Sequence, residues 1–361
     1  MTGKLASWTI AHFTVDMGCI YILYKGVWAY YFDSSLLTLG AAIMLYNCIA
    51  FGLQMVIGYI ADKHPKMEKA IGPIGLGGML IPLVILGFSQ GAMASWVSLV
   101  LCALFNATFH VGGGMDVLKT SNGKIAPSGI FVSSGALGVI SGTLYGGAGH
   151  DILLPVGVTL LAVLFLYLFT KKQPTNLYSE DWESSAIKLT GHGMGFICAC
   201  LFVAIFIRSF SGLVWPIGFE KTGMLVALPA IASCLGKALG GILADKIGAL
   251  ETAVVSLSLS IVLPFISTDL WVVIGLSILF FNMAMPITLC GLAAVMPENT
   301  GFAFGLSTFA LLLGYIAYAL LTSFCKTTSN YSIYIITILG IVAILLIALA
   351  LRTKNKKQHV G

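Results

Sequence analysis

The chemistry of this chain centres on a carboxylate and two imidazoles that interrupt apolar segments. Asp16 follows His12 by four residues within the apolar stretch Trp8 to Tyr24, and His110 follows Asn106 by four residues in another. Residues four apart share one face of a helix, and a charge at the bilayer centre costs about 2.5–3.5 kcal/mol or more. Burial raises the pKa of a carboxyl group, a nearby cation lowers it, and histidine titrates near neutral pH. We therefore expect Asp16 to exchange protons, with His12 and His110 as relay partners.

Other polar residues in apolar segments are expected to bind a solute. Arg208 lies in the middle of an apolar segment and keeps its charge at all relevant pH values. It either binds an anionic substrate group or pairs with Asp16, and the sequence leaves both open. Asn106 and Asn282 are predicted substrate ligands, although buried asparagines also join helices by hydrogen bonds. A static hydrogen bond between His12 and Asp16 that fixes helix packing is likewise the alternative to proton exchange.

Composition indicates that membrane helices hold these residues. Of the 361 residues, 58% are hydrophobic and 9% are charged, with a mean hydropathy of +0.98, whereas a soluble domain has about 25% charged residues. A spanning helix needs about 20 mostly apolar residues. Polar, glycine, proline or charged breaks divide the chain into twelve such segments, at residues 5–24, 36–60, 70–89, 94–115, 125–147, 152–170, 191–217, 223–244, 249–267, 270–292, 301–323 and 331–351.

Basic residues are distributed unevenly between the loops of this map. Fourteen of the 19 lysines and arginines fall on the side of the two termini, three fall in loops on the other side, and two fall within helices. Short loops rich in lysine and arginine stay in the cytoplasm. The bias therefore predicts an even number of spans with both termini cytoplasmic.

The two halves of the chain repeat each other. The second predicted helix ends in GYIADK (residues 58–63) and the eighth ends in GILADK (residues 241–246), while a Phe-Asn pair recurs at Asn106 and Asn282. Duplicated bundles are common in secondary transporters, whose substrate site lies near the midplane at the repeat interface. We expect an N-terminal six-helix bundle (residues 1–170), a cytoplasmic linker (171–190), a C-terminal six-helix bundle (191–352) and a cytoplasmic tail (353–361).

The loop motifs resemble those of the major facilitator superfamily, where G-x-x-x-D-R/K-x-G-R/K follows the second helix and is echoed after the eighth. Seven residues carry the resemblance: Gly58, Asp62, Lys63 and Lys66 in the first copy, and Gly241, Asp245 and Lys246 in the second. Glycine allows close helix approach, and the aspartate can bind basic groups and a facing helix N-terminus. The resemblance implies an all-α polytopic membrane protein, with twelve transmembrane helices in two pseudo-symmetric six-helix bundles, and a gating role for these residues.

Two shorter motifs resemble the fosmidomycin-resistance branch of that superfamily. The stretch from His12 to Asp16 (HFTVD) resembles the motif that opens the branch, and Phe109-His110 resembles its pair in the fourth helix. That branch contains proton-driven drug exporters. In the superfamily fold, helices one, four, seven and ten line the central cavity, and the polar residues singled out above fall on these helices.

Motifs of several other classes do not occur in the sequence. There is no G-x-x-x-x-G-K-[ST], so ATP drive from this chain is not expected. No H-E-x-x-H occurs, and neither an enzyme activity nor a cofactor is expected. The eight cysteines form no C-x-x-C pair and lie mostly in apolar spans, where they are expected to pack as small hydrophobes.

The sequence therefore predicts a proton-coupled secondary active transporter for a small organic solute. Efflux of a drug-like or metabolic compound is favoured, and proton-coupled uptake of an organic anion, which Arg208 favours, is the alternative. Transport of a divalent transition metal by His12, Asp16 and His110 is a further alternative, since histidine and carboxylate bind such ions. The expected partners are the solute, protons and lipid, without nucleic acid. We expect a monomer in a bacterial cytoplasmic (inner) membrane.

Overall fold

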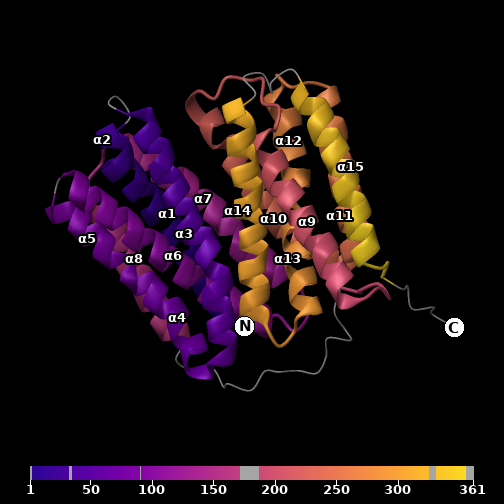
Figure 1. Ribbon diagram of the computed structural model, residues 1–361, viewed down its shortest axis with the longest axis horizontal. Helices are drawn as coiled ribbons and strands as arrows, with labels where there is room; N and C mark the ends of the chain where they lie inside the picture. Colours follow the sequence, from indigo (N-terminus) through magenta and orange to yellow (C-terminus); the bar gives the residue numbers. More distant parts are fainter. Residues whose placement is uncertain (1, 32–34, 90, 171–186, 325–330, 355–361) are drawn as a thin grey trace. The chain divides into compact units, whose positions relative to one another are not determined.

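The computed structural model is built of helices in the part of the chain that it describes, residues 2–31, 35–89, 91–170, 187–324 and 331–354 (Figure 1). Up to residue 170 these are α1 (Thr2–Ile22), the π-helical turn η1 (Leu23–Trp28), α2 (Ala29–Tyr31), α3 (Leu36–Lys63), α4 (Pro65–Gly78), α5 (Leu80–Phe88), α6 (Ala92–Thr120), α7 (Ala126–Gly147) and α8 (Leu153–Thr170). After residue 187 they are α9 (Met194–Leu213), the 3₁₀ turn η3 (Gly223–Ala227), α10 (Leu228–Ile247), α11 (Ala249–Val262), the 3₁₀ turn η4 (Leu263–Phe265), α12 (Trp271–Asn282), α13 (Ala284–Val295), α14 (Thr300–Phe324) and α15 (Ser332–Ala350).

Every predicted apolar segment overlaps a helix, so the all-helical prediction is confirmed. Two of the segments are interrupted near their middle, one at Met79 between α4 and α5 and the other at Met283 between α12 and α13. A proline follows each interruption by three residues, Pro82 and Pro286. Because proline has no N–H, the carbonyl four residues before it loses its helical hydrogen bond.

Nine helical stretches among the described residues are long and apolar enough to cross a membrane. Two further apolar helices, Leu153–Phe169 and Ala249–Phe265, are shorter, and α1 is not among the nine. The apolar run of α1 is interrupted by polar side chains, among them His12 and Asp16. The chain is therefore a multi-pass integral membrane protein, while twelve spans and cytoplasmic termini stay predictions.

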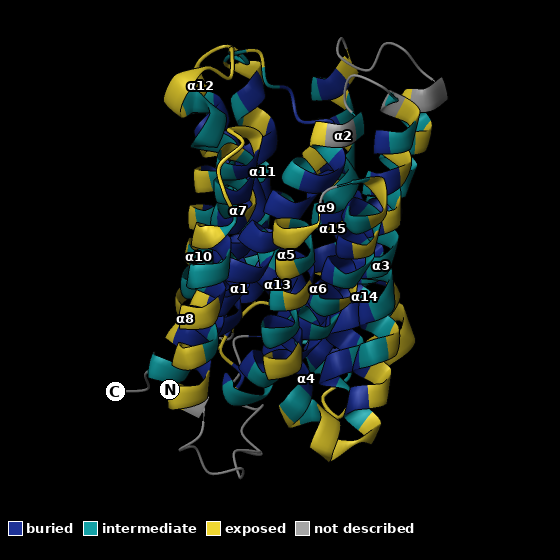
Figure 2. Cartoon of the chain, turned by 90° about the vertical axis from the view of Figure 1, so that its left-hand side faces the viewer, coloured by how far each residue is buried: buried dark blue, intermediate teal, exposed yellow. Residues whose placement is uncertain are grey.

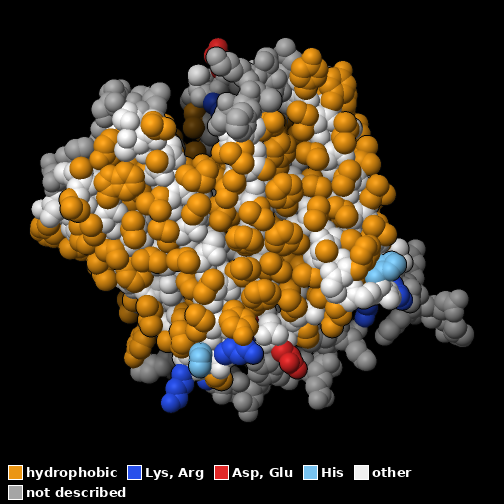
Figure 3. Space-filling view, in the orientation of Figure 1, with side chains coloured by type: hydrophobic (Ala, Val, Ile, Leu, Met, Phe, Trp, Pro, Cys, Tyr) orange, Lys and Arg blue, Asp and Glu red, His pale blue; other side chains and the backbone are white. Residues whose placement is uncertain are grey.

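Large hydrophobic side chains cover the outward sides of the helices. On α8 alone, Leu160, Leu161, Leu164, Phe165 and Leu168 are exposed. Buried residues lie on the inner sides of the helices (Figure 2), and hydrophobic side chains cover most of the face presented in Figure 3. Lipid is the solvent that tolerates such a surface, since soluble proteins rarely expose large contiguous apolar patches.

Local signals set several of the helix ends. At the start of α3, Ser35 Oγ accepts a hydrogen bond from the backbone N–H of Thr38, with 3.2 Å between the heavy atoms. Pro65 opens α4, where its missing N–H and fixed φ are tolerated. Gly248 separates α10 from α11 with a φ of 113°, a conformation that favours glycine.

The helices form two compact units. The first comprises α1 to α6, α7 from Ile130 onward, α8, and residues Glu298–Leu312, which include the start of α14. The second comprises Ser121–Gly129, which include the start of α7, together with α9 to α13, the remainder of α14 and α15. Most of the predicted linker (171–190) and tail (353–361) lies outside the described residues, so the bundle boundaries stay predictions.

Glycines bring α7 directly against α1 within the first unit. A Cβ atom at Gly138 would clash with the carbonyl oxygen of Phe13, and one at Gly142 would crowd that of Met17. Small residues at such spacing let helix backbones approach closely. One turn earlier, Gly135 faces the polar side chains of α1.

Candidate proton and solute sites

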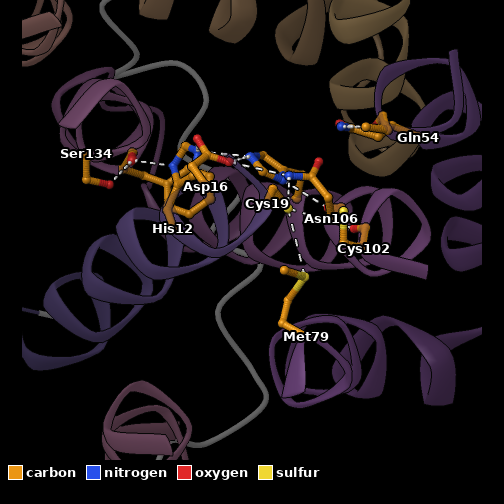
Figure 4. Close-up of polar contacts among 11 residues, drawn as sticks. His12, Asp16, Cys19, Gln54, Met79, Cys102, Asn106 and Ser134 are labelled. Atoms are coloured by element: carbon orange, nitrogen blue, oxygen red, sulfur yellow. Dashed lines mark hydrogen bonds and ion pairs between the residues drawn. The ribbon is translucent and has the colours of Figure 1, made fainter. Parts of the chain in front are cut away.

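The two predicted polar pairs meet inside the first unit. His12 and Asp16 lie on α1, and Asn106 and His110 lie on α6. His12 Nε2 is 3.3 Å from Asp16 Oδ2, and His110 Nε2 is 3.5 Å from Asp16 Oδ1. The two Nε2 atoms are 2.9 Å apart. Figure 4 labels His12, Asp16 and Asn106 of this group. His12, Asp16 and His110 are called the His–Asp cluster below.

Backbone carbonyls fix the protonation of both imidazoles. His12 Nδ1 lies 2.8 Å from the carbonyl oxygen of Phe131, and His110 Nδ1 lies 2.9 Å from that of Asn106. A carbonyl oxygen only accepts hydrogen bonds, so each Nδ1 carries a hydrogen. Two neutral rings would then direct lone pairs at each other between the Nε2 atoms. A proton placed between the two Nε2 atoms would remove this repulsion, and Asp16 lies beside both rings.

The side chains of the cluster are largely buried but keep a small exposed fraction. Its side chains are 7% (His12), 13% (His110) and 16% (Asp16) exposed. The ring of Phe131 lies 4.7 Å from that of His12 between centroids, and the ring of Phe109 lies 6.3 Å from it. In such surroundings charges interact more strongly than in water.

Asn106 supports the cluster from α6. Its Nδ2 lies 3.4 Å from Asp16 Oδ1 and 3.4 Å from Cys19 Sγ, and its carbonyl oxygen orients His110. The predicted contact of Asn106 with substrate stays a prediction, whereas its contact with Asp16 is a feature of the structure.

Three contributions from α7 were missing from the sequence-based site. Phe131 supplies the carbonyl that orients His12, and Ser134 Oγ donates to the same carbonyl at 3.0 Å. A Cβ at Gly135 would clash with Asp16 and His12, so glycine leaves the space that their side chains occupy. The glycine run in α7 was the available signal for a close approach, but a backbone carbonyl leaves no mark on the sequence.

Asp62 and Asp245, from the two loop motifs, each cap the N-terminus of a helix. Asp62 accepts hydrogen bonds from the N–H groups of Gly301 (3.0 Å) and Phe302 (2.8 Å), in the first turn of α14 and within the first unit. In the second unit, Asp245 accepts hydrogen bonds from the N–H groups at residues 125 (2.8 Å) and 126 (2.9 Å), at the start of α7. A carboxylate at a helix N-terminus satisfies free donors and complements the helix dipole.

The other motif residues surround these caps. A Cβ at Gly58 would clash with the backbone at the start of α14, and one at Gly241 would press on the backbone at residues 125–126. Lys63, Lys66 and Lys246 are exposed at the helix ends, and Lys63 Nζ lies 5.4 Å from the centroid of a tyrosine ring. Gating by these seven residues stays a prediction.

Arg208 and Asn282 lie in the second unit and differ in how their polar atoms are used. Asn282 Oδ1 accepts from Ser233 Oγ at 3.0 Å, and its Nδ2 donates to the carbonyl oxygen of Ile278 at 2.8 Å. The Nε of Arg208, on α9, is buried without a hydrogen-bond partner among the described residues. Since Asp16 belongs to the first unit, its pairing with Arg208 stays a prediction, as does substrate binding by both residues of the second unit.

Comparison with solved structures identifies the fold. The crystal structure of an E. coli fucose:proton symporter matches with a TM-score of 0.69 at 12% identity, covering 95% of this chain and 97% of the symporter. A second structure, of the major facilitator superfamily transporter FucP in the outward conformation, matches with a TM-score of 0.61 at 10% identity, covering 94% and 99%. No protein-family model and no curated protein sequence matches the chain. The chain thus has the fold of major facilitator transporters.

Proposed function

We propose that the chain is a secondary active transporter that couples the movement of a small organic solute to that of a proton by alternating access. The observation that carries this proposal is the 2.9 Å contact between the Nε2 atoms of His12 and His110, whose Nδ1 atoms are both held by carbonyls. The fold is that of a proton symporter, and the outward surface suits a membrane. We place the chain in a bacterial cytoplasmic membrane.

The proton acts through the electrostatics of the His–Asp cluster. Asp16 lies 3.3 and 3.5 Å from the two imidazole nitrogens, and unit charges at that separation attract by about 5 kcal/mol at an effective dielectric constant of about 20. When the proton leaves, this attraction is lost and two nitrogen lone pairs face each other. The contact between α1 and α6 then loses its stability, so proton occupancy is linked to the arrangement of these helices.

The aspartate caps are proposed to gate the alternation. Asp62 holds the first turn of α14 and Asp245 holds that of α7. Release of a cap exposes a partly buried carboxylate and frees two N–H groups. Each helix start therefore has a bound state and a released state, which differ by these hydrogen bonds.

The direction of transport follows from where the solute and the proton bind relative to each other. The resemblance of the stretch from His12 to Asp16 to proton-driven exporters favours efflux of a drug-like or metabolic compound. The alternative is uptake of an organic anion, since the matched structure is that of a proton symporter and Arg208 favours an anionic solute. A cluster that binds one proton per cycle serves either direction.

The test is transport in proteoliposomes that contain the pH dye pyranine. A panel of organic acids and amphiphilic drugs is added under an imposed pH gradient of either sign, and active compounds are followed as labelled solutes. We expect Asp16→Asn to lose accumulation driven by the gradient and to retain solute exchange. Asp151→Asn, at an exposed carboxylate outside the cluster, is the matched control. Accumulation in Asp16→Asn equal to wild type would refute the proton role.

A divalent transition metal is the second candidate cargo. One ligand atom from each of His12, Asp16 and His110 lies within 4.8 Å of the others. Metal-binding histidines commonly orient their second nitrogen on a carbonyl, as both histidines do here. Calorimetric titration of the purified protein with Zn²⁺ separates the candidates, since metal transport requires saturable binding that Asp16→Asn abolishes.

A further inference from the structure

A row of hydrogen-bond donors follows one side of α9 and continues just past its end. Arg208 and Ser211 are three residues apart on α9, so they share one helix face. Trp215 follows just past the end of the helix. The three residues are called the donor face below. At 1.5 Å of rise per residue, Arg208 and Ser211 are about 4.5 Å apart along the helix axis, and Trp215 extends the row beyond the helix end.

Each member of the donor face has a buried polar atom without a hydrogen-bond partner among the described residues. These atoms are Arg208 Nε, Ser211 Oγ and Trp215 Nε1. Ser211 is 2% exposed and Trp215 is 8% exposed. An unsatisfied buried polar group costs about 1–3 kcal/mol. Three such groups in one row indicate a site that is completed by a molecule rich in acceptors.

Trp215, at the end of the donor face, and Gly212 beside it contact α12 in the second unit. The ring centroids of Trp215 and Phe281 are 4.3 Å apart, and a Cβ at Gly212 would contact Phe281. The opposite side of α9 packs against α14, since a Cβ at Gly314 would clash with Ser209. The three donors therefore do not face lipid, and two aromatic rings form an apolar wall at one end of their row.

We propose that the donor face binds an organic monocarboxylate with further oxygen acceptors along its length, such as a hydroxycarboxylate or a sugar acid. Arginine and tryptophan side chains only donate hydrogen bonds, so a ligand must offer acceptors to both. A guanidinium matches a carboxylate through two parallel hydrogen bonds, and one guanidinium balances one carboxylate charge. The carboxylate lies at Arg208, the other oxygens lie at Ser211 and Trp215, and the carbon skeleton contacts the aromatic wall.

This inference rests on the proposed transport function and names its substrate class, but binding can be measured without transport. The purified full-length protein is titrated calorimetrically with gluconate, glycerate and lactate, and with sorbitol and glycerol as neutral analogues. Inorganic phosphate and glycerol 3-phosphate test whether the site prefers phosphate. We expect saturable binding of at least one carboxylate, and at least about tenfold weaker binding of its neutral analogue and of the phosphates.

Variants assign the binding to the donor face. Arg208→Gln is expected to weaken carboxylate binding by about 10- to 100-fold. Trp215→Phe keeps the aromatic wall and removes the N–H. It should therefore weaken the binding only of carboxylates that carry a distal oxygen acceptor, and the affinity for lactate should not change. Ser211→Ala weakens binding, whereas Ser209→Ala, on the opposite side of α9, leaves it unchanged.

The outcomes separate this site from the transport proposal. Absence of carboxylate binding, tighter binding of phosphates, or unchanged affinity in both Arg208→Gln and Trp215→Phe would overturn the inference while leaving proton-coupled transport intact. Conversely, the protein could bind carboxylates through Arg208 while its accumulation of solute does not depend on the pH gradient. That outcome would support the site and overturn the proton coupling. A thermal unfolding curve like that of wild type shows that each variant is folded.

Discussion

Replacement of Asp62 by asparagine tests how firmly the first turn of α14 is held. The carboxylate accepts two hydrogen bonds, from Gly301 and Phe302, and hydrogen bonds to a charged group contribute about 1.5–3 kcal/mol each. The asparagine side chain has one acceptor oxygen and no charge, so it loses one bond, weakens the other, and loses about 0.3–1 kcal/mol of interaction with the helix dipole. We expect the cap to weaken by about 2–4 kcal/mol in total.

Hydrogen–deuterium exchange at single-residue resolution measures this loss. The N–H groups of Gly301 and Phe302 lie in the first turn, where no carbonyl of the same helix can accept from them, so their protection depends on Asp62. A loss of about 2–4 kcal/mol corresponds to exchange faster by about 30- to 1,000-fold. Asp245→Asn is the internal control, because it should accelerate exchange at residues 125 and 126 and leave α14 unchanged. Equal exchange at Gly301 in wild type and Asp62→Asn would refute the assigned cap.

The remaining predictions concern the packing of α7 and the protons of the two histidines. Gly138→Ala should lower the midpoint of thermal unfolding, because the added Cβ clashes with the carbonyl of Phe13. Gly40→Ala, where nothing lies within 4 Å of the added atom, should keep or raise that midpoint. In ¹⁵N-histidine NMR spectra, we expect hydrogens on both Nδ1 atoms of His12 and His110 and one shared proton between their Nε2 atoms. Detection of a bare Nδ1 on either ring would contradict the shared proton.

Helical spacing explains why much of the His–Asp cluster could be predicted from the sequence. The four-residue separation in each pair fixes a common face on one helix, and the high cost of Asp16 in lipid requires that face to meet polar partners. The structure brings His12, Asp16, Asn106 and His110 together as these arguments require. The repeated GxxxD motif likewise pointed to the two aspartates that cap helix starts.

Other features depend on backbone groups or on atoms that lack partners, and neither leaves a pattern in the sequence. The carbonyl of Phe131 orients His12 from a helix more than a hundred residues away along the chain. Ser211 and Trp215 have the residue types of ordinary packing positions, and only the structure reveals their unsatisfied atoms. The interruptions at Met79 and Met283 follow from prolines that were visible in the sequence but were not used to divide the segments.

The starts of α7 and α14 are each capped by an aspartate from the opposite half of the sequence. The aspartate of each half caps a helix encoded in the other half, since Asp62 holds residues 301 and 302 and Asp245 holds residues 125 and 126. An ancestor that encoded one half alone would leave its aspartate without the N–H groups that it binds here and would leave the corresponding helix start uncapped, and two copies would satisfy each other as a symmetric homodimer. We therefore expect two fragments of this chain, severed between α8 and α9, to accumulate only when they are produced in the same cell.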